Sequence, residues 1–373
     1  MPFGTMRTIG RILMIGAALL SPAACSLFKT KTSAAPRGFV FPLQEEARLD
    51  LDGELIGNPQ IRAGRIYFST RIGTLYAVDA ASKKVLWKVE TKPPAASPPS
   101  VGSDRLVFAD NDNGLVCLAL DGKALWAKKI PAKLSREVVL DSGRIYLSAD
   151  DSDLLALNAA DGTEAWRFKA GGAIRTGPII WNLQVIFGTD EGKIYILDPQ
   201  GRLGAAVETG SGIAGPLAIE KNRLYLGLAE GSFRCLDVAI LRELWTVKTG
   251  GFPASRPAVD ERRVYVVTSN NVLYGFNKWN GNLDWWRMLP ARSPFSPAVG
   301  EEQAFIASLS PVMTVLKKAT GEYGGGYSAG EELRSAPVRI GDNIVIHTYA
   351  QETAKAALIF LKGTPPPEPA KKK

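Results

Sequence analysis

The side chains that most often perform chemistry in proteins are scarce in this chain of 373 residues. The single histidine, His347, has no partner at a recognisable metal-ligand spacing. We also infer no Ser-His-Asp set built around a nucleophile-elbow sequence. We therefore expect no catalytic residues, no metal site and no cofactor, and we interpret His347 as an ordinary strand residue.

The three cysteines divide into two kinds. Cys117 and Cys235 each fall inside a β-rich run and lie about three repeats apart, a separation that makes a disulfide between them geometrically difficult, so buried thiols are expected. Cys25 instead follows an N-terminal basic segment, an apolar run over residues 12–20 and the small residues Ala23 and Ala24. That pattern is typical of a secretory signal, and the apolar run is too short to span a bilayer comfortably.

The N-terminal pattern resembles a bacterial lipoprotein signal, which implies that Cys25 is lipidated and becomes the first mature residue. Pro22 stands where such motifs usually carry an aliphatic residue, so cleavage after Ala24 without lipidation remains an alternative. Ser26 is compatible with delivery to the outer membrane. The sequence thus predicts a signal peptide over 1–24, and a lipidated cysteine with a flexible tether over 25–38.

The net charge of +8 is concentrated at the two ends of the chain. Residues 1–38 and 363–373 together account for seven of these positive charges, which leaves the rest of the chain nearly neutral. A neutral body shows no electrostatic footprint of nucleic-acid binding. We interpret the Pro- and Lys-rich residues 363–373 as a disordered tail.

The part of the chain between these ends consists of eight copies of one pattern, about 40 residues apart. Each copy opens with a small residue and usually a proline, at Asn58-Pro59, Pro98-Pro99, Gly177-Pro178, Gly215-Pro216, Arg256-Pro257, Ser296-Pro297 and Ala336-Pro337, and Glu137-Val138 takes this place once. Two runs alternating at period two follow, separated by a tight-turn signal such as Gly73 or Asn113-Gly114, and a run carrying tryptophan usually closes the copy.

Period-two alternation without helical stretches predicts an all-β, eight-bladed β-propeller of four-stranded antiparallel blades over residues 39–362. The eighth copy ends without its tryptophan strand, whereas an unassigned β-like stretch from Phe39 to Leu43 precedes the first copy. We therefore expect this N-terminal strand to complete the last blade and join the two chain ends.

The repeats resemble the quinoprotein-type, or PQQ-like, propeller repeat, in which an Asp or Asn, a glycine turn and a tryptophan follow one another, as in 156–166 and 275–285. The recurring tryptophans are interpreted as packing wedges between blades: Trp87, Trp126, Trp166, Trp245 and Trp285. The fourth copy departs, with Val207 near the tryptophan position. Dehydrogenases built on this repeat hold a quinone and calcium, and many carry an adjacent cysteine pair or a Cys-x-x-Cys-His motif. This sequence has neither, so a non-enzyme is expected.

A lipoprotein-like start and eight such repeats resemble the BamB family, lipoproteins of the outer-membrane β-barrel assembly machinery. The resemblance implies a non-catalytic scaffold, lipid-anchored at the outer membrane and facing the periplasm, whose rim docks the barrel-inserting subunit. Ile174 and Arg175 are the nearest match to the family's partner-binding loop, although the spacing from Arg175 to Pro178 is shorter than the spacing expected in the family. The acidic pair that the family uses near the following blade has no counterpart in 211–215. An ordinary connecting loop is the alternative for these residues. The alternative functions are binding of another envelope protein or a polysaccharide and, less favoured, a quinoprotein dehydrogenase.

Overall fold

A computed structural model describes residues 40–134 and 137–364. The chain divides into two units, Met1–Arg37 and Gly38–Lys373. The predicted signal peptide, Cys25 and the tether lie outside the described residues, as does residue 365 onward in the predicted tail. The described residues contain 32 β-strands and no helix, and therefore no helix of the length and hydrophobicity that a membrane crossing requires.

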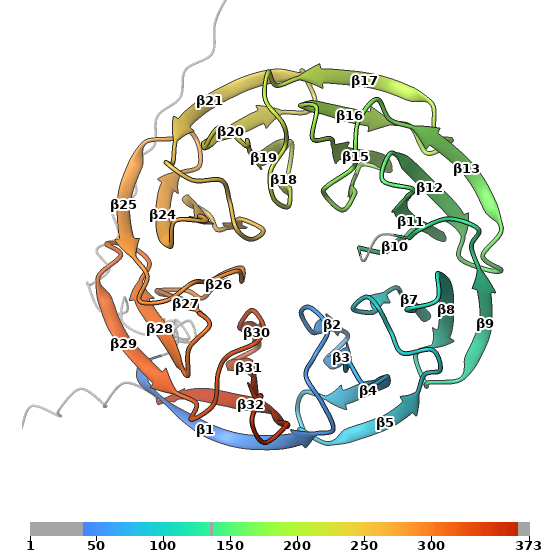
Figure 1. The fold of residues 1–373 in the computed structure, drawn as a ribbon. Coiled ribbons are helices and arrows are strands. Elements are labelled where there is room, and N and C mark those ends of the chain that lie inside the picture. Colours follow the sequence, from blue (N-terminus) through green and yellow to red (C-terminus); the bar gives the residue numbers. More distant parts are fainter. Residues whose placement is uncertain (1–39, 135–136, 365–373) are drawn as a thin grey trace, which may run out of the picture. The chain divides into compact units, whose positions relative to one another are not determined.

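The strands form eight four-stranded antiparallel sheets that surround one axis as the blades of a propeller (Figure 1). This confirms the predicted fold class. From the innermost to the outermost strand, blade 1 consists of β2 (Gln60–Arg62), β3 (Arg65–Ser69), β4 (Thr74–Asp79) and β5 (Val85–Glu90); blade 2 of β6 (Ser100–Val101), β7 (Arg105–Ala109), β8 (Gly114–Ala119) and β9 (Ala124–Lys129); blade 3 of β10 (Val139–Asp141), β11 (Arg144–Ala149), β12 (Asp153–Asn158) and β13 (Glu164–Lys169); and blade 4 of β14 (Ile179–Trp181), β15 (Gln184–Gly188), β16 (Lys193–Leu197) and β17 (Leu203–Glu208).

The second half of the ring repeats this order. Blade 5 consists of β18 (Ala218–Glu220), β19 (Arg223–Gly227), β20 (Ser232–Asp237) and β21 (Arg242–Lys248); blade 6 of β22 (Ala258–Val259), β23 (Arg263–Val267), β24 (Val272–Asn277) and β25 (Leu283–Met288); blade 7 of β26 (Ala298–Val299), β27 (Gln303–Ile306), β28 (Val312–Lys317) and β29 (Tyr323–Ser328); and blade 8 of β30 (Val338–Ile340), β31 (Asn343–Ala350), β32 (Lys355–Thr364) and β1 (Val40–Leu51).

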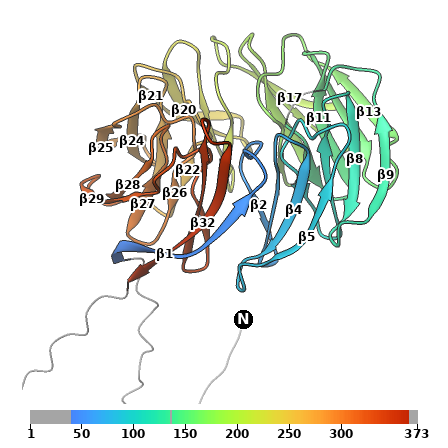
Figure 2. The same cartoon turned by 60° about the horizontal axis from the view of Figure 1, so that its bottom comes forward.

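The eighth blade joins the two ends of the propeller unit, as predicted. β1 pairs antiparallel with β32, from Val40 opposite Thr364 to Leu51 opposite Ala356, and Figure 2 shows the two strands side by side. The side chain of Leu43 is buried among residues of blades 7 and 8, and the Tyr327 hydroxyl of blade 7 donates a hydrogen bond of 3.0 Å to Glu45. Closure therefore depends on contacts across the longest sequence separation in the fold.

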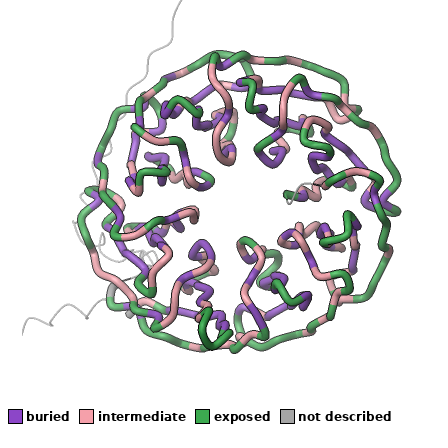
Figure 3. The backbone as a smooth tube through the Cα atoms, viewed as in Figure 1, coloured by how far each residue is buried: buried purple, intermediate pink, exposed green. Residues whose placement is uncertain are grey.

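The core lies between the blades. Eight clusters of buried side chains each combine residues of two neighbouring blades; one contains Tyr67 and Leu75 of blade 1 with Phe108 of blade 2, and another unites blade 8 with blade 1. The two middle strands of each blade are largely buried on both faces, whereas most residues of the outer strands are exposed or half-buried (Figure 3). Each blade is therefore stabilised mainly by its neighbours, because a single sheet would leave both apolar faces in water.

Five of the junctions share one contact between a tryptophan and a glycine. The indole N–H donates to a backbone carbonyl in the turn between the third and fourth strands of the next blade, over 2.9–3.1 Å; the pairs are Trp87 with Leu120, Trp126 with Ala159, Trp166 with Pro199, Trp245 with Lys278 and Trp285 with Lys318. Each turn holds a glycine at positive φ under the ring; a Cβ at Gly201, for example, would lie 2.4 Å from Trp166. The indole can therefore approach only where the turn has no side chain.

Blades without this tryptophan show the complementary pattern. Strand register places Ala205, and not Val207 as the sequence suggested, at the tryptophan position of blade 4, because Ala205 faces Ile196 just as Trp166 faces Ala156 in blade 3. The following turn, in blade 5, accordingly has Leu241 at positive φ in place of glycine. Lys83 holds this place in blade 1, where its Nζ lies 3.0 Å from Glu46 of β1. An ion pair thus replaces the aromatic contact at the closing junction.

Candidate functional site

The loops that carry Ile174 and Arg175 connect the outer strand of one blade to the inner strand of the next. Ile174 lies in the connection from β13 to β14, forms an isolated bridge with Thr189 and donates its N–H to Asp151 O over 2.6 Å. Its side chain is 7% exposed and belongs to the core between blades 3 and 4. Bridges at the same place in other blades use Leu55, Ala95, Leu134, Ile213, Pro253 and Leu333. Ile174 is therefore a repeated core position, which its spacing of about 40 residues from these positions could have revealed.

Arg175, the next residue, is exposed. Its Nε lies 3.4 Å from Asp190 Oδ2, in the turn between β15 and β16. The other carboxylate oxygen of Asp190 accepts a hydrogen bond from the N–H of Ala173 over 2.8 Å. Asp190 thus links the connecting loop to the neighbouring turn and holds the Arg175 guanidinium at the rim, where 55% of its side chain remains accessible.

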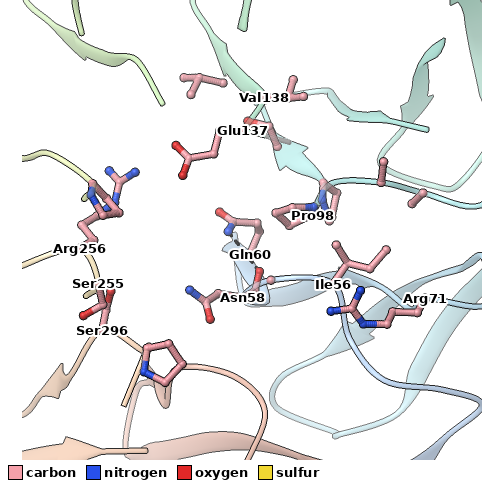
Figure 4. Close-up of a pocket in the computed structure, with 18 of the residues that line it drawn as sticks. Ile56, Asn58, Gln60, Arg71, Pro98, Glu137, Val138, Ser255, Arg256 and Ser296 are labelled. Carbon is pink, nitrogen blue, oxygen red and sulfur yellow. Dashed lines mark hydrogen bonds between the residues drawn. The ribbon is translucent and has the colours of Figure 1, made fainter. Parts of the chain in front are cut away.

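A cavity of about 840 Å³ lies at the centre of the ring (Figure 4). Its wall contains residues that open six of the eight repeats, because these stand next to the axis, just before the innermost strands of blades 1, 2, 3, 5, 6 and 7. The polar and charged groups include Asn58, Gln60, Glu137, Ser255, Arg256 and Ser296. None of the described residues that line the cavity is aromatic, so this wall offers hydrogen bonds and charge without a ring for stacking. Arg71, on the same wall, is already paired with Glu54 at 2.7 Å.

His347 lies away from this cavity, inside β31, and is completely buried. Burial lowers the pKa of its imidazole to about 3, helped by the charge of Arg334, so the ring is neutral at physiological pH. Neither ring nitrogen has a hydrogen-bond partner within the described part of the chain. The same residues contain no group of three or more His, Cys, Asp or Glu side chains that could hold a metal ion.

Cys117 and Cys235 are buried free thiols in the middle strands of blades 2 and 5. Burial raises the pKa of each thiol to about 11, which keeps both protonated and unreactive at neutral pH. Neither contributes to the central cavity. Cys25, the predicted lipidation site, lies outside the described residues.

The outer edge of blade 6 differs from the edges of blades 1 to 5 in its polarity. At the positions one and three residues after the repeated tryptophan place, blades 1 to 5 carry Lys88 and Glu90, Ala127 and Lys129, Arg167 and Lys169, Ala206 and Glu208, and Thr246 and Lys248. Blade 6 carries Trp286 and Met288, both at least half exposed, with Arg287 half-buried between them. The sequence analysis missed this exposed apolar pair, which becomes visible only when the outer strands of the blades are compared position by position.

The family model described as outer membrane protein assembly factor BamB matches residues 71–205 and 190–358. The chain belongs to the BamB family. Among curated relatives, BamB of Nitrosomonas eutropha is 23% identical over 224 residues, or 60% of this chain and 49% of the relative, and BamB of Bordetella pertussis is 22% identical over 81% and 86% of the two chains.

Other BamB matches are shorter. BamB of Escherichia coli is 33% identical over 90 residues, which cover 21% of this chain and 23% of the relative. The chain therefore spans about half the length of the Nitrosomonas relative and about a quarter of the Escherichia coli one in these matches.

Solved structures agree on the fold. BamB from Moraxella catarrhalis superposes with a TM-score of 0.75 at 13% identity, covering 86% of this chain and 98% of the other. Quinohemoprotein alcohol dehydrogenase from Comamonas testosteroni superposes with a TM-score of 0.68 at 12% identity, over 89% and 78% of the two chains. Because an assembly factor and an oxidoreductase share this architecture, the fold alone does not assign a function.

Proposed function

We propose that this protein is a non-catalytic scaffold that supports the assembly of outer-membrane β-barrel proteins. The observation that carries the proposal is membership of the BamB family across residues 71–358. The protein is anchored at the outer membrane by lipid on Cys25, faces the periplasm and presents a rigid rim to the barrel-inserting subunit. Short loops fixed by bridges to neighbouring turns suit this role, since a preformed surface loses little conformational entropy when it binds.

Within this proposal Arg175 contacts the partner and Ile174 holds the loop. The buried Ile174 side chain fixes the backbone on which Arg175 stands, and Asp190 orients the guanidinium without covering it. An arginine held in this way offers several donors at low entropic cost, a property of residues that dominate binding at interfaces.

The proposal is tested by affinity purification of the full-length protein from its own membranes, with mass spectrometry of the proteins that co-purify. The barrel-inserting subunit should be recovered with the wild type and lost with Arg175→Glu. Arg202→Glu is the matched control, because Arg202 is also exposed and paired with an aspartate, Asp198, but lies at the other end of β16. Recovery of a different envelope protein or a polysaccharide instead of that subunit would contradict the assembly role.

A further inference from the structure

Arg256 is a charged residue at a repeat position that faces the ring axis. The equivalent positions in the other blades are Asn58, Pro98, Glu137, Gly177, Gly215, Ser296 and Ala336. Six of these seven residues are uncharged, which suits a position where eight inner strands converge on the axis. Arg256 is exposed to the cavity, and no carboxylate among the described residues lies within ion-pair distance of its guanidinium. Its charge is therefore available to a ligand inside the cavity.

Ser255, the residue before Arg256, differs in its hydrogen bonding from the hydroxyl residues at the same place in other repeats. Ser255 lines the same wall and is 5% exposed, yet its hydroxyl has no hydrogen-bond partner among the described residues. At the same repeat place, the hydroxyls of Ser97 and Thr176 accept backbone N–H groups over 2.9 and 3.3 Å, and Ser335 donates to a carbonyl over 3.3 Å. Blade 6 is thus the exception among these four blades, and a buried hydroxyl without a partner is costly unless a ligand or water satisfies it.

The opposite wall carries complementary groups. Figure 4 shows the Glu137 carboxylate and the Arg256 guanidinium projecting into the same space, with Asn58 and Gln60 beside them. The amide of Gln60 donates to the Asn58 carbonyl over 3.3 Å, and the Asn58 Oδ1 accepts from the Ala336 N–H over 2.9 Å, so both side chains are held in place. The Glu137 carboxylate also lies where a Cβ at Gly177 would be, so this arrangement requires glycine in blade 4.

We propose that the central cavity binds the carboxylate end of a peptide-like ligand. Arg256 pairs with the carboxylate and Ser255 donates its hydroxyl proton to the same group. Amide N–H groups further along the ligand meet the Glu137 carboxylate and the carbonyl oxygen of the Gln60 side chain. A simple inorganic anion could contact Arg256 and Ser255 but has no amide N–H groups for Glu137 and Gln60, and the Glu137 carboxylate repels it. The cavity volume lies within the range of small-ligand sites, about 300–1,000 Å³.

Isothermal titration calorimetry on the full-length protein in detergent tests this site. The probes are acetyl-trialanine with a free carboxylate, the same peptide as its C-terminal amide, and inorganic phosphate. We expect the free acid to bind and the amide and phosphate each to bind at least about tenfold more weakly, as the loss of a charge-assisted hydrogen bond predicts. Arg256→Gln should weaken binding of the free acid by about the same factor, and Ser255→Ala by a smaller one.

Arg71→Gln is the matched control, because Arg71 lines the same cavity but is already paired with Glu54. It should leave the affinity for the free acid within about threefold of the wild type. Thermal denaturation of each variant identifies any loss of fold. Failure of the free acid to bind at millimolar concentration, equal binding of acid and amide, phosphate binding as tight as that of the peptide, or wild-type affinity in a folded Arg256→Gln variant would each overturn the proposal.

Discussion

The contact between tryptophan and glycine across neighbouring blades predicts that alanine at Gly201 is far more harmful than alanine at a glycine of similar conformation that no indole covers, such as Gly64. Gly201 has a φ of 79° and a Cβ there would lie 2.4 Å from Trp166. Gly64 has a φ of 73° and open space where its Cβ would be. The positive φ should cost about 1–2 kcal/mol in both variants. Only Gly201→Ala adds an overpacking cost of about 1–3 kcal/mol.

The assay is thermal and urea denaturation of wild type, Gly64→Ala, Gly201→Ala, Trp166→Ala and the double variant Trp166→Ala with Gly201→Ala. Removing the indole should itself destabilise the protein, by up to about 3–5 kcal/mol. In that background Gly201→Ala should cost no more than Gly64→Ala, because the clash is gone. The cycle should therefore show a coupling energy of about 1–3 kcal/mol. Equal losses for the two glycine variants, or a coupling near zero, would refute the packing argument.

Three further predictions concern stability and one concerns localisation. Burial holds the pKa of the His347 imidazole at about 3, below the ordinary 6.5, so the unfolded chain takes up a proton first as the pH falls. The contribution of His347 to stability should therefore be full above pH 6.5 and decline towards pH 3. His347→Leu should flatten this decline in melting temperatures measured at pH 7.5 and 4.5. Leu43→Ala should open the junction that β1 completes and cost about 2–5 kcal/mol in urea denaturation, whereas the same change at the exposed Leu203 should cost little. Replacing Trp286 by Thr and Met288 by Lys, the residues of blade 5, should shift the unfolding free energy by less than about 0.5 kcal/mol and reduce self-association in sedimentation experiments. A large loss of stability would show instead that both side chains pack against the rest of the protein. Finally, Cys25→Ser should move the protein from the outer-membrane fraction to the soluble periplasmic fraction, and a variant that stays with the membrane would argue against lipid anchoring through Cys25.

Turn chemistry was the most reliable local signal in the sequence. The glycines and asparagines predicted at the hairpins do adopt positive φ, as Gly73 and Asn113 show. These residues tolerate that conformation by themselves, so their meaning does not depend on distant contacts. The position in blade 4 that is equivalent to the tryptophan is Ala205, two residues before the Val207 suggested by the sequence, because strand pairing that includes a bulge, and not residue type, decides which position faces the next blade.

Ile174 and Arg256 show what local reasoning could not reach. Ile174 in a loop suggested a contact residue, yet the bridge to Thr189 turns its side chain into the core and leaves Arg175 at the surface. From the sequence, Arg256 is recognisable only as the start of a repeat. Its position on the axis, beside a serine without a partner and in the same space as Glu137, follows from the convergence of blades separated by more than a hundred residues.

The sequence by itself determined the number of blades, the strand order within each and the closure by β1, because a repeat of about 40 residues with period-two alternation is a local property that each copy restates. The tertiary structure alone decided which indole meets which glycine, which loop residue is buried and which charges share the central cavity. Those outcomes depend on register and on the approach of neighbouring blades, where a shift of one or two residues changes the side chain that occupies a contact.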